Sequence, residues 1–243
     1  MTPKQTFMYG IASYLLFLFT LLYLVFFTGE LWVPWTAGSG VSANPWQDAA
    51  FNFMLISIFG LQHSVMAREG FKKWWTQHVP EHLERSHYVM ISTLVMLVLL
   101  VAWRPNGTVL WHFEHPWIVK PLWTLFTLGW LLAAFATFLT DHFDLFGLRQ
   151  VYLHYVEQSY TRVEFSQHAV YKLVRHPMML GMLIGFWVTP YMTVGHLVLA
   201  LGFTVYILIG IYFEERSLLK SLGEDYRMYR ERTPKLIPRF KKT

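Results

Sequence analysis

The tripeptide Arg175-His176-Pro177 opens a long apolar region and is the first pattern that could do chemistry. Proline is favoured in the first turn of a helix, and the unpaired amide groups of a helix start attract anions. Arg175 and His176 adjoin that start and could add charge-assisted hydrogen bonds to a carboxylate or a phosphate. The same letters would also arise from an arginine that extends to the membrane surface beside an interfacial histidine.

Two adjacent carboxylates, Glu214 and Glu215, end this apolar region. One of them could pair with Arg175 or bind a cationic group of a ligand. Because adjacent residues do not share a helix face, at most one is expected to point into a given site. The chain beyond them predicts an amphipathic tail helix, which on its pattern alone indicates an interfacial anchor. Its apolar positions are Leu218, Leu219, Leu222, Tyr226 and Tyr229.

Polar residues also interrupt an earlier apolar run. His63 and Ser64 lie near its end, and Asn52 precedes His63 by about three helical turns and so shares its face. An ionisable side chain at membrane depth is a candidate for function. His63 could accept a proton from a substrate, or it could close a hydrogen bond between two helices.

A third group of titratable residues, Asp141, His142 and Asp144, follows the next-to-last apolar run. Such residues commonly end a helix and are solvated at the membrane surface. They could equally carry protons at a site. The pattern by itself leaves both interpretations open.

Composition requires these residues to be positioned by membrane-spanning helices. The chain has 243 residues, of which 54% are hydrophobic and 14% charged, whereas charged residues make up about 25% of a soluble domain. There is no cysteine, which excludes disulfides, a thiolate nucleophile and cysteine metal sites. We therefore expect an all-α integral membrane protein.

Four apolar runs are long enough to span a bilayer. They are Phe7 to Thr28, Ala49 to Ala67, Tyr88 to Trp103 and Leu122 to Thr140. The later region from Met178 to Phe213 is broken at Thr189-Pro190 and predicts a helical hairpin. Its first arm, Met178 to Val188, would be only about 16 Å long, too short to cross a hydrocarbon core of about 30 Å. Either the arm extends beyond these limits, or the hairpin turns within the membrane against other helices.

Positive charge predicts the orientation. Arg104 and Lys120 are the only two of the 20 basic residues that fall on one side of these spans. The positive-inside rule therefore puts both termini and the active site in the cytoplasm. The net charge of +5 is then explained by orientation and anionic membrane lipid, without nucleic acid. We expect residues 1–140 to form the membrane region with the substrate side, and residues 141–243 to form the cofactor-binding core.

The C-terminal motifs resemble the core of the isoprenylcysteine carboxyl methyltransferase superfamily. The resemblance rests on Arg175 to Gly181, Glu214-Glu215, Leu218, Gly223, Tyr226, Tyr229 and Pro234. These are membrane methyltransferases that use S-adenosylmethionine. The resemblance implies a cofactor site made of Arg175, His176, Pro177, Gly181, Glu214, Glu215 and Tyr226. Met179 stands where the superfamily often has tyrosine.

Three further segments look like the NnrU-like branch of that superfamily. They are Leu61 to Arg68, Arg85-Ser86 with Tyr88, and Asp141 to Gln150. Within the branch they are most similar to methanethiol S-methyltransferases, which convert methanethiol to dimethyl sulfide. The attacking form of a thiol is the thiolate, so a proton acceptor is expected. The resemblance implies catalytic roles for His63, Ser64, Asp141 and Asp144.

Two other functions remain compatible with the sequence. A lipid or prenyl-cysteine methyltransferase would share the cofactor site but needs a wide lateral opening between spans. A membrane accessory or transport protein could use histidines as metal ligands, and His112 and His115 form one His-x-x-His pair in an outer loop. We expect a small thiol and membrane lipid as partners, no metal, and no protein partner.

Overall fold

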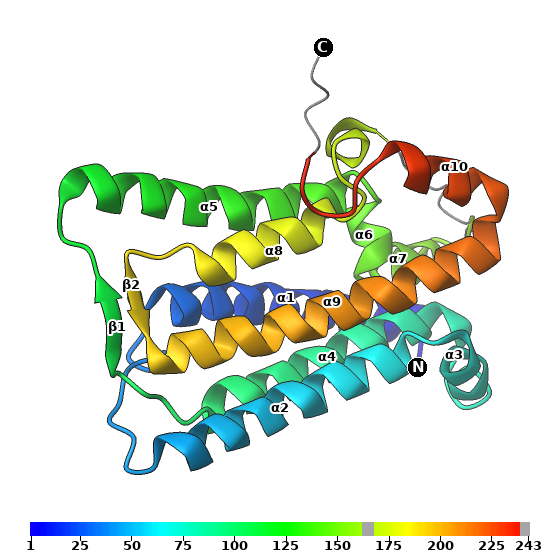
Figure 1. Ribbon diagram of the computed structural model, residues 1–243. Helices are drawn as coiled ribbons and strands as arrows, with labels where there is room; N and C mark the ends of the chain where they lie inside the picture. The colour runs from blue at the N-terminus through cyan, green and yellow to red at the C-terminus, as the bar shows by residue number, and fades with distance from the viewer. Residues whose placement is uncertain (162–167, 239–243) are drawn as a thin grey trace.

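The computed structural model describes residues 1–161 and 168–238, which form a bundle of long helices (Figure 1). Within these residues five helices are long and apolar enough to cross a membrane. They are α1 (Pro3–Gly29), α2 (Pro45–Met66), α4 (Glu81–Ala102), α5 (Pro116–Phe138) and α9 (Val194–Leu222). The expectation of a helical, multi-span membrane protein is confirmed. Segments 162–167 and 239–243, which the sequence assigned to the cytoplasmic loop and tail, lie outside the described residues.

The predicted hairpin is present, and its first arm is indeed short. Helix α8 (Pro177–Trp187) has 11 residues and leads through a turn into α9. The turn contains strand β2 (Tyr191–Thr193), which pairs antiparallel with β1 (Val109–His112). The chain is thus mostly helical, rather than all-α as we expected. Strands β1 and β2 have only four and three residues, which is too short for a strand pattern to be recognised in the sequence.

The small sheet pairs the backbone of the turn that joins α8 to α9. Irregular backbone at membrane depth is tolerated only where protein or water satisfies its polar groups. Here the amide of Phe113 donates to the carbonyl of Pro190 at 2.9 Å. The indole of Trp111 donates to the carbonyl of Thr189 at 3.2 Å. The β1 segment therefore supplies the hydrogen bonds that the proline break leaves open.

Helix α8 is held against α5 by small residues on both helices. A Cβ atom added at Gly181 would lie 2.5 Å from the backbone nitrogen of Ala133 and 2.5 Å from the carbonyl oxygen of Gly129. Glycine at these positions lets the two backbones approach closely, as in many membrane helix pairs. The short arm is thus fixed by packing along its length as well as at its turn.

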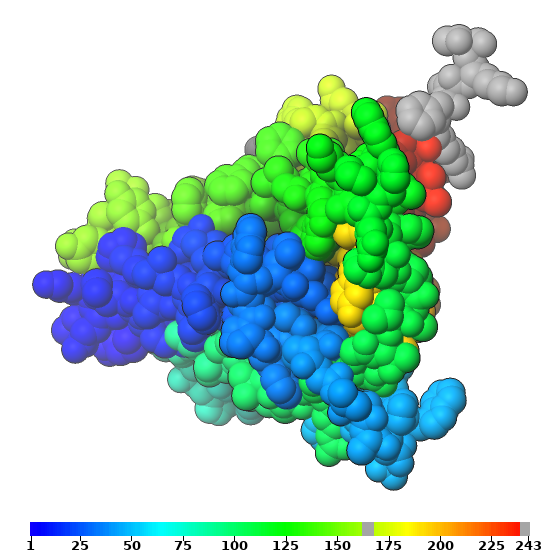
Figure 2. All heavy atoms as spheres, turned by 90° about the vertical axis from the view of Figure 1, so that its left-hand side faces the viewer, coloured from blue at the N-terminus to red at the C-terminus, as the bar shows by residue number. Residues whose placement is uncertain are grey.

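The two ends of the bundle differ in character. The N-terminus and the short helices α3 (Glu69–Trp75), α7 (Leu148–Tyr155) and α10 (Glu224–Arg232) gather at one end, and the sheet lies at the other (Figure 1). Figure 2 views the sheet end, where the yellow hairpin turn lies between the blue α1–α2 connection and green α5. Trp32, Trp46 and Trp117 are each more than 80% exposed there, as expected of tryptophan at a membrane–water interface.

The tail differs from the single amphipathic helix expected after Glu214-Glu215. Helix α9 runs through both glutamates to Leu222, and α10 begins at Glu224. Gly223 separates the helices with a φ of 59°, a conformation that glycine adopts without steric penalty. Leu218 and Leu222 therefore extend the hairpin arm, whereas Tyr226 belongs to a separate helix that turns back over the bundle.

Candidate functional site

A buried ion pair joins the two ends of the hairpin. Nε and Nη2 of Arg175 donate to Oε1 of Glu215 at 2.9 and 2.7 Å. Arg175 is 9% exposed and Glu215 5%. The two residues are distant in sequence and meet because α9 returns alongside α8. The expected pairing of Arg175 with one of the two glutamates is present in the structure.

The same arginine binds the tail. Its Nη1 donates to the carbonyl of Arg230 at 2.9 Å and also to the carbonyl of Thr233. The backbone amide of Arg175 donates to the carbonyl of Pro234 at 2.9 Å. Arginine presents five donors in a rigid fork, and here four of its donor contacts go to the protein itself. Arg175 thus fastens the tail across the start of α8.

His176 connects the two glutamates. Its Nε2 lies 3.1 Å from Oε1 of Glu215, and its Nδ1 lies 3.5 Å from Oε2 of Glu214. The side chain of Glu215 is 7% exposed, whereas that of Glu214 is 47% exposed. As the helix geometry predicted, the two carboxylates point differently. Glu215 is part of the buried network, and Glu214 presents its oxygens at the edge of it.

Half-exposed cations and two tyrosines, of which Tyr226 is buried, surround this edge. Nε of Arg230 and Nζ of Lys235 lie 4.0 and 3.8 Å from Oε2 of Glu215. Burial and the charge of Glu215 raise the pKa of Tyr226 to about 12. Burial also raises the pKa of Tyr171, and the charge of Glu214 acts in the same direction. These phenols therefore remain protonated and can donate hydrogen bonds at neutral pH.

Pro177 and Gly181 are buried parts of α8. Pro177 occupies the first turn of the helix, as predicted. Gly181 lies against α5, so close packing alone accounts for its lack of a side chain. Both residues shape the helix that carries the Arg175 network.

A second group of polar side chains lies around His63. The hydroxyl of Tyr88 lies 2.6 Å from Nε2 of His63. The rings of Phe59 and Tyr206 flank the imidazole with centroid distances of 5.4 and 6.1 Å. Ser64, the next residue, shares a hydrogen bond with Tyr206. Asn52, on the same helix face as His63, is instead bound to the backbone of Arg104 at the far end of α2.

Asp141 and Asp144 form a third group around helix α6 (His142–Leu145). The side chain of Asp141 caps the helix by accepting the amide of Asp144 at 3.1 Å. Nη1 of Arg149 donates to Oδ1 of Asp144 at 3.0 Å, and its Nε lies 3.9 Å from Asp141. Tyr160 donates to the other oxygen of Asp144 at 3.3 Å. These aspartates thus organise the loop, with one of their partners, Arg149, inside the Asp141 to Gln150 motif.

His142 lies within the same loop and is fully bonded. Its Nε2 lies 2.6 Å from the hydroxyl of Tyr14, and its Nδ1 lies 2.6 Å from the hydroxyl of Thr137. The ring stacks on Phe138 at 4.1 Å. Burial lowers its pKa, against the opposing charge of Asp141. His142 therefore ties α1 to the end of α5.

Arg85 connects the second and third groups. Its Nε donates to the carbonyl of Leu145 at 2.6 Å, and its guanidinium lies 4.8 Å from the ring centroid of Tyr88. His63, Tyr88, Arg85 and α6 thus form one continuous chain of contacts. Sequence reasoning did not assign roles to Tyr206, Arg149 or Tyr171, although Arg85 and Tyr88 were part of a recognised motif.

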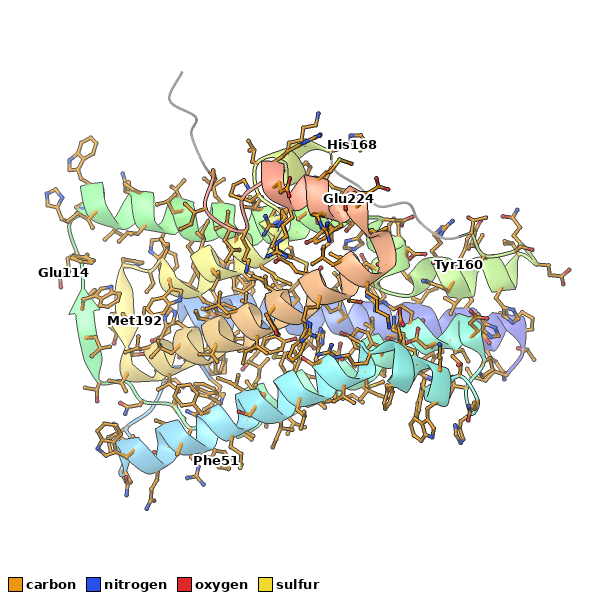
Figure 3. The ribbon with its side chains drawn as sticks, turned by 45° about the vertical axis from the view of Figure 1, so that its right-hand side comes forward. Phe51, Glu114, Tyr160, His168, Met192 and Glu224 are labelled. Carbon is orange, nitrogen blue, oxygen red and sulfur yellow. The ribbon has the colours of Figure 1, made fainter. Side chains whose placement is uncertain are left out.

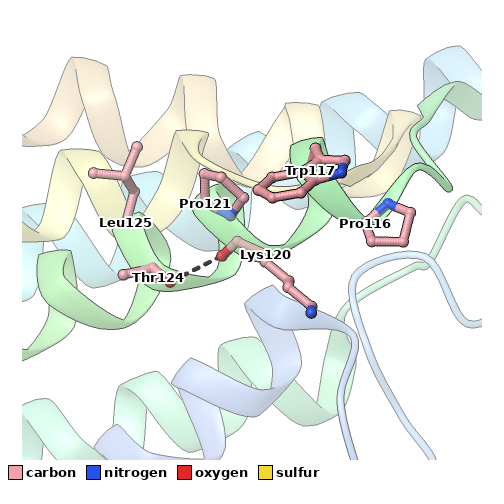
Figure 4. A pocket seen from close by; sticks show the side chains of 6 residues that line it. All are labelled: Pro116, Trp117, Lys120, Pro121, Thr124 and Leu125. Atoms are coloured by element: carbon pink, nitrogen blue, oxygen red, sulfur yellow. Dashed lines mark hydrogen bonds between the residues drawn. The ribbon is translucent and has the colours of Figure 1, made fainter.

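Two hollows of the surface are lined by none of these residues. One hollow of about 500 Å³ is lined by the first turns of α5, including Trp117, Lys120 and Pro121 (Figure 4). Another is lined by the N-terminal residues from Met1 to Met8. Figure 3 shows that Glu114, just before α5, lies at the opposite end of the bundle from Tyr160. In the described part of the chain, no cluster of three or more His, Asp or Glu side chains could hold a metal ion.

Comparison with known proteins decides the family. The family described as NnrU protein matches residues 53–238. This chain belongs to the NnrU family. A relative from Mycobacterium tuberculosis named methanethiol S-methyltransferase is 46% identical over 233 residues, covering 96% of each chain.

Further relatives include another methanethiol S-methyltransferase and a protein of a different name. Methanethiol S-methyltransferase 1 from Bradyrhizobium diazoefficiens is 44% identical and aligns with 96% of this NnrU protein and 81% of its own length. Nurim from Rattus norvegicus is 32% identical over 177 residues, covering 70% of this chain and 67% of its own. No solved structure matches the chain.

Proposed function

We propose that this NnrU protein is an S-adenosylmethionine-dependent methyltransferase that converts methanethiol to dimethyl sulfide. The observation that carries the proposal is the near full-length likeness to methanethiol S-methyltransferases, at 46% and 44% identity. The alignment extends over the Arg175 network and over the His63 group. The acceptor is a small thiol, and the product is a thioether.

The residues around Glu214 fit the methyl donor. S-adenosylmethionine offers an amino group, a carboxylate and ribose hydroxyls, and when bound it supplies a methyl group activated by a positively charged sulfur. Glu214 is the half-exposed carboxylate that can meet the amino group. Arg230 and Lys235, each about half exposed, can meet the carboxylate. Tyr226 can donate to an oxygen atom, and Arg175, His176 and Glu215 hold these groups in place. The Tyr171 hydroxyl instead donates to the carbonyl of Ala136 at 3.4 Å.

His63 is the proton acceptor on the thiol side. Its surroundings are aromatic, because Phe59, Tyr206 and Tyr88 all lie within contact distance of its ring. Such walls exclude water and favour an apolar thiol. Ser64 acts through Tyr206, to which it is hydrogen-bonded. Asp141 and Asp144 position the loop that Arg85 connects to this group.

Helix α9 joins the donor side to the thiol side. Tyr206 precedes Glu214 by eight residues, a rise of about 12 Å along a helix. The charge of Glu214 acts on the Tyr206 hydroxyl, so the two side chains lie within electrostatic range of each other. Holding two reactants in line can contribute about 7–11 kcal/mol to a bimolecular reaction. One rigid helix is well suited to that purpose.

Both termini and the active site face the cytoplasm in this proposal. Among the described residues, Lys4 near the N-terminus, Lys72 and Lys73 of α3, and Arg227, Arg230 and Arg232 of α10 belong to elements at one end of the bundle (Figure 1). Exposed tryptophans mark the sheet end, where Arg104 and Lys120 are the basic residues within the described ranges 1–161 and 168–238. This asymmetry supports the cytoplasmic orientation of the basic end.

Aromatic packing favours a small acceptor over a prenyl or lipid chain. Phe203 stacks on Phe186 at 4.8 Å and contacts Phe59 at 6.0 Å. Both Phe59 and Phe203 are less than 8% exposed. These rings occupy the space between α2, α8 and α9 that a long chain would need. A small thiol needs no such opening.

Headspace detection of dimethyl sulfide tests the function directly. Detergent-purified protein is given methanethiol and S-adenosylmethionine, and donor binding is measured in parallel by calorimetry. Product that requires both reactants supports the proposal. If the protein binds the donor, forms no dimethyl sulfide and methylates a prenyl-cysteine or lipid, then that compound replaces methanethiol as the acceptor. Folded protein that binds no donor would overturn the methyltransferase assignment.

A further inference from the structure

The two ring nitrogens of His63 have different surroundings. Nε2 lies 2.6 Å from the hydroxyl of Tyr88. Nδ1 is buried and has no hydrogen-bond partner among residues 1–161 and 168–238. A buried polar atom without a partner is costly and uncommon in folded proteins. Such an atom beside a reaction site is a candidate for contact with substrate.

Tyr88 is buried and has several packing partners besides His63. The residue is 6% exposed and packs in one cluster with Met66 and Val89. The guanidinium of Arg85 covers its ring at 4.8 Å. Arg85 is itself fixed by the carbonyl of Leu145 at 2.6 Å. The phenol oxygen therefore offers a fixed point to which the imidazole can be oriented.

The direction of the hydrogen bond between Tyr88 and His63 decides which ring nitrogen of His63 can act as a base. A neutral imidazole has one N–H donor and one acceptor nitrogen, and the hydrogen bond of one nitrogen sets the state of the other. If Nε2–H donates to the Tyr88 oxygen, Nδ1 carries the lone pair. If Tyr88 instead donates to Nε2, Nδ1 carries the proton and cannot accept another.

We infer that Tyr88 is a positioning residue that accepts the Nε2–H of His63 and leaves Nδ1 free to take the proton of the acceptor thiol. The inference rests on the proposed function, because it assigns His63 to the thiol side. Arg85 contributes by fixing Tyr88, and Tyr206 faces the imidazole from α9. These are the titratable and charged groups that lie against His63 from α4 and α9.

The step balances without any further reactant. The thiol proton passes to Nδ1 of His63, and the thiol sulfur forms a bond to the methyl carbon of the donor. The bond between that carbon and the donor sulfur breaks, and its electron pair stays on the departing thioether. The imidazolium then releases its proton to water, so one proton is formed for each methyl group transferred.

Activity as a function of pH separates this role from simple support of the fold. Tyr88→Phe removes the phenol oxygen and should lower kcat by about 100-fold or more, the low end of the effect of a positioned proton acceptor. Donor affinity should not change. The loss should narrow as pH rises, because thiolate formed in solution no longer needs a base. Tyr23→Phe is the control. It removes a hydroxyl that donates to the carbonyl of Trp35 near the C-terminal end of α1, and it should retain the parent activity and pH profile.

Nitrogen NMR tests the tautomer without turnover. In protein labelled with ¹⁵N-histidine, the His63 signals are assigned by their absence in His63→Gln. The inference predicts a protonated Nε2 and a bare Nδ1 in the parent, and a mixture in Tyr88→Phe. A protonated Nδ1 in the parent, or an activity loss constant at every pH, would overturn it. If neither the parent nor any variant methylates methanethiol, the proposed function is rejected. The NMR result would still decide the tautomer of His63.

Discussion

The Arg175 network and the His63 group lie in the same bundle but differ in the kind of side chains that surround them. Around Arg175, charges neutralise one another, and the arginine, His176 and Glu215 are all less than 10% exposed. Around His63, the neighbours are aromatic rings and hydroxyls, and one ring nitrogen lacks a partner. A charged network suits the recognition of a polar donor, because charge-assisted hydrogen bonds are strong and directional. An aromatic group suits an apolar thiol that must lose one proton.

Removal of the central carboxylate should have the largest effect. Glu215→Ala leaves the buried guanidinium of Arg175 without its counterion, which typically destabilises a protein by about 3–5 kcal/mol. Glu215 also orients the guanidinium of Arg175, which binds the tail carbonyls of Arg230 and Thr233. The tail should therefore detach as well. Thermal unfolding and limited proteolysis of the tail measure both effects. Glu224→Gln, in an exposed pair with Arg227, is the matched control and should leave both unchanged.

The next largest effect should appear in turnover alone. His63→Ala removes the proton acceptor and should lower kcat by about 100- to 10,000-fold. Donor affinity, measured by calorimetry, should remain that of the parent, because the donor contacts lie around Glu214. His78→Ala, at an exposed site bonded to the carbonyl of Trp74, serves as the control. An unchanged kcat would remove His63 from the mechanism and would erase the distinction between the two regions.

A smaller effect is expected at the half-exposed glutamate. Glu214→Gln keeps the size of the side chain but removes the charge that would meet the donor amino group. A hydrogen bond to a charged group contributes about 1.5–3 kcal/mol, so the donor Kd should rise by roughly 10- to 100-fold. The melting temperature should change little, because the carboxylate lies outside the buried pair. If Glu214→Ala and Glu215→Ala both bind donor like the parent, the donor assignment is wrong.

The smallest effect concerns His142, whose nitrogens are both bonded. His142→Gln should reduce stability by about 1 kcal/mol through its lost hydrogen bonds and leave the pH dependence of turnover unchanged. Burial lowers the pKa of His142 in the folded state. Stability from this residue is therefore present above its ordinary pKa of about 6.5 and declines as pH falls below it. Melting curves from pH 5 to pH 8 should show a weaker decline in the variant, and a steeper one would contradict this account.

Sequence alone determined the membrane class and the location of its spans. A long apolar run can be recognised from the sequence without knowing what it packs against. The first four predicted spans therefore agree with α1, α2, α4 and α5, and the predicted hairpin agrees with α8 and α9. The Thr189-Pro190 break also predicted the short arm, because proline removes a backbone donor wherever it stands. The sequence offered an ion pair between Arg175 and one of the two glutamates as one of two possibilities, and the structure shows that pair with Glu215.

Only the tertiary structure decided how each polar group is bonded. The pairing of β1 with β2 depends on two segments about 80 residues apart, and neither has a strand pattern long enough to recognise. Whether Arg175 is free or occupied depends on where the tail carbonyls lie. The difference between His63 and His142 likewise lies in their neighbours, Tyr88 in one case and Tyr14 with Thr137 in the other. Residue type sets which hydrogen bonds are possible, whereas packing between distant helices sets which of them form.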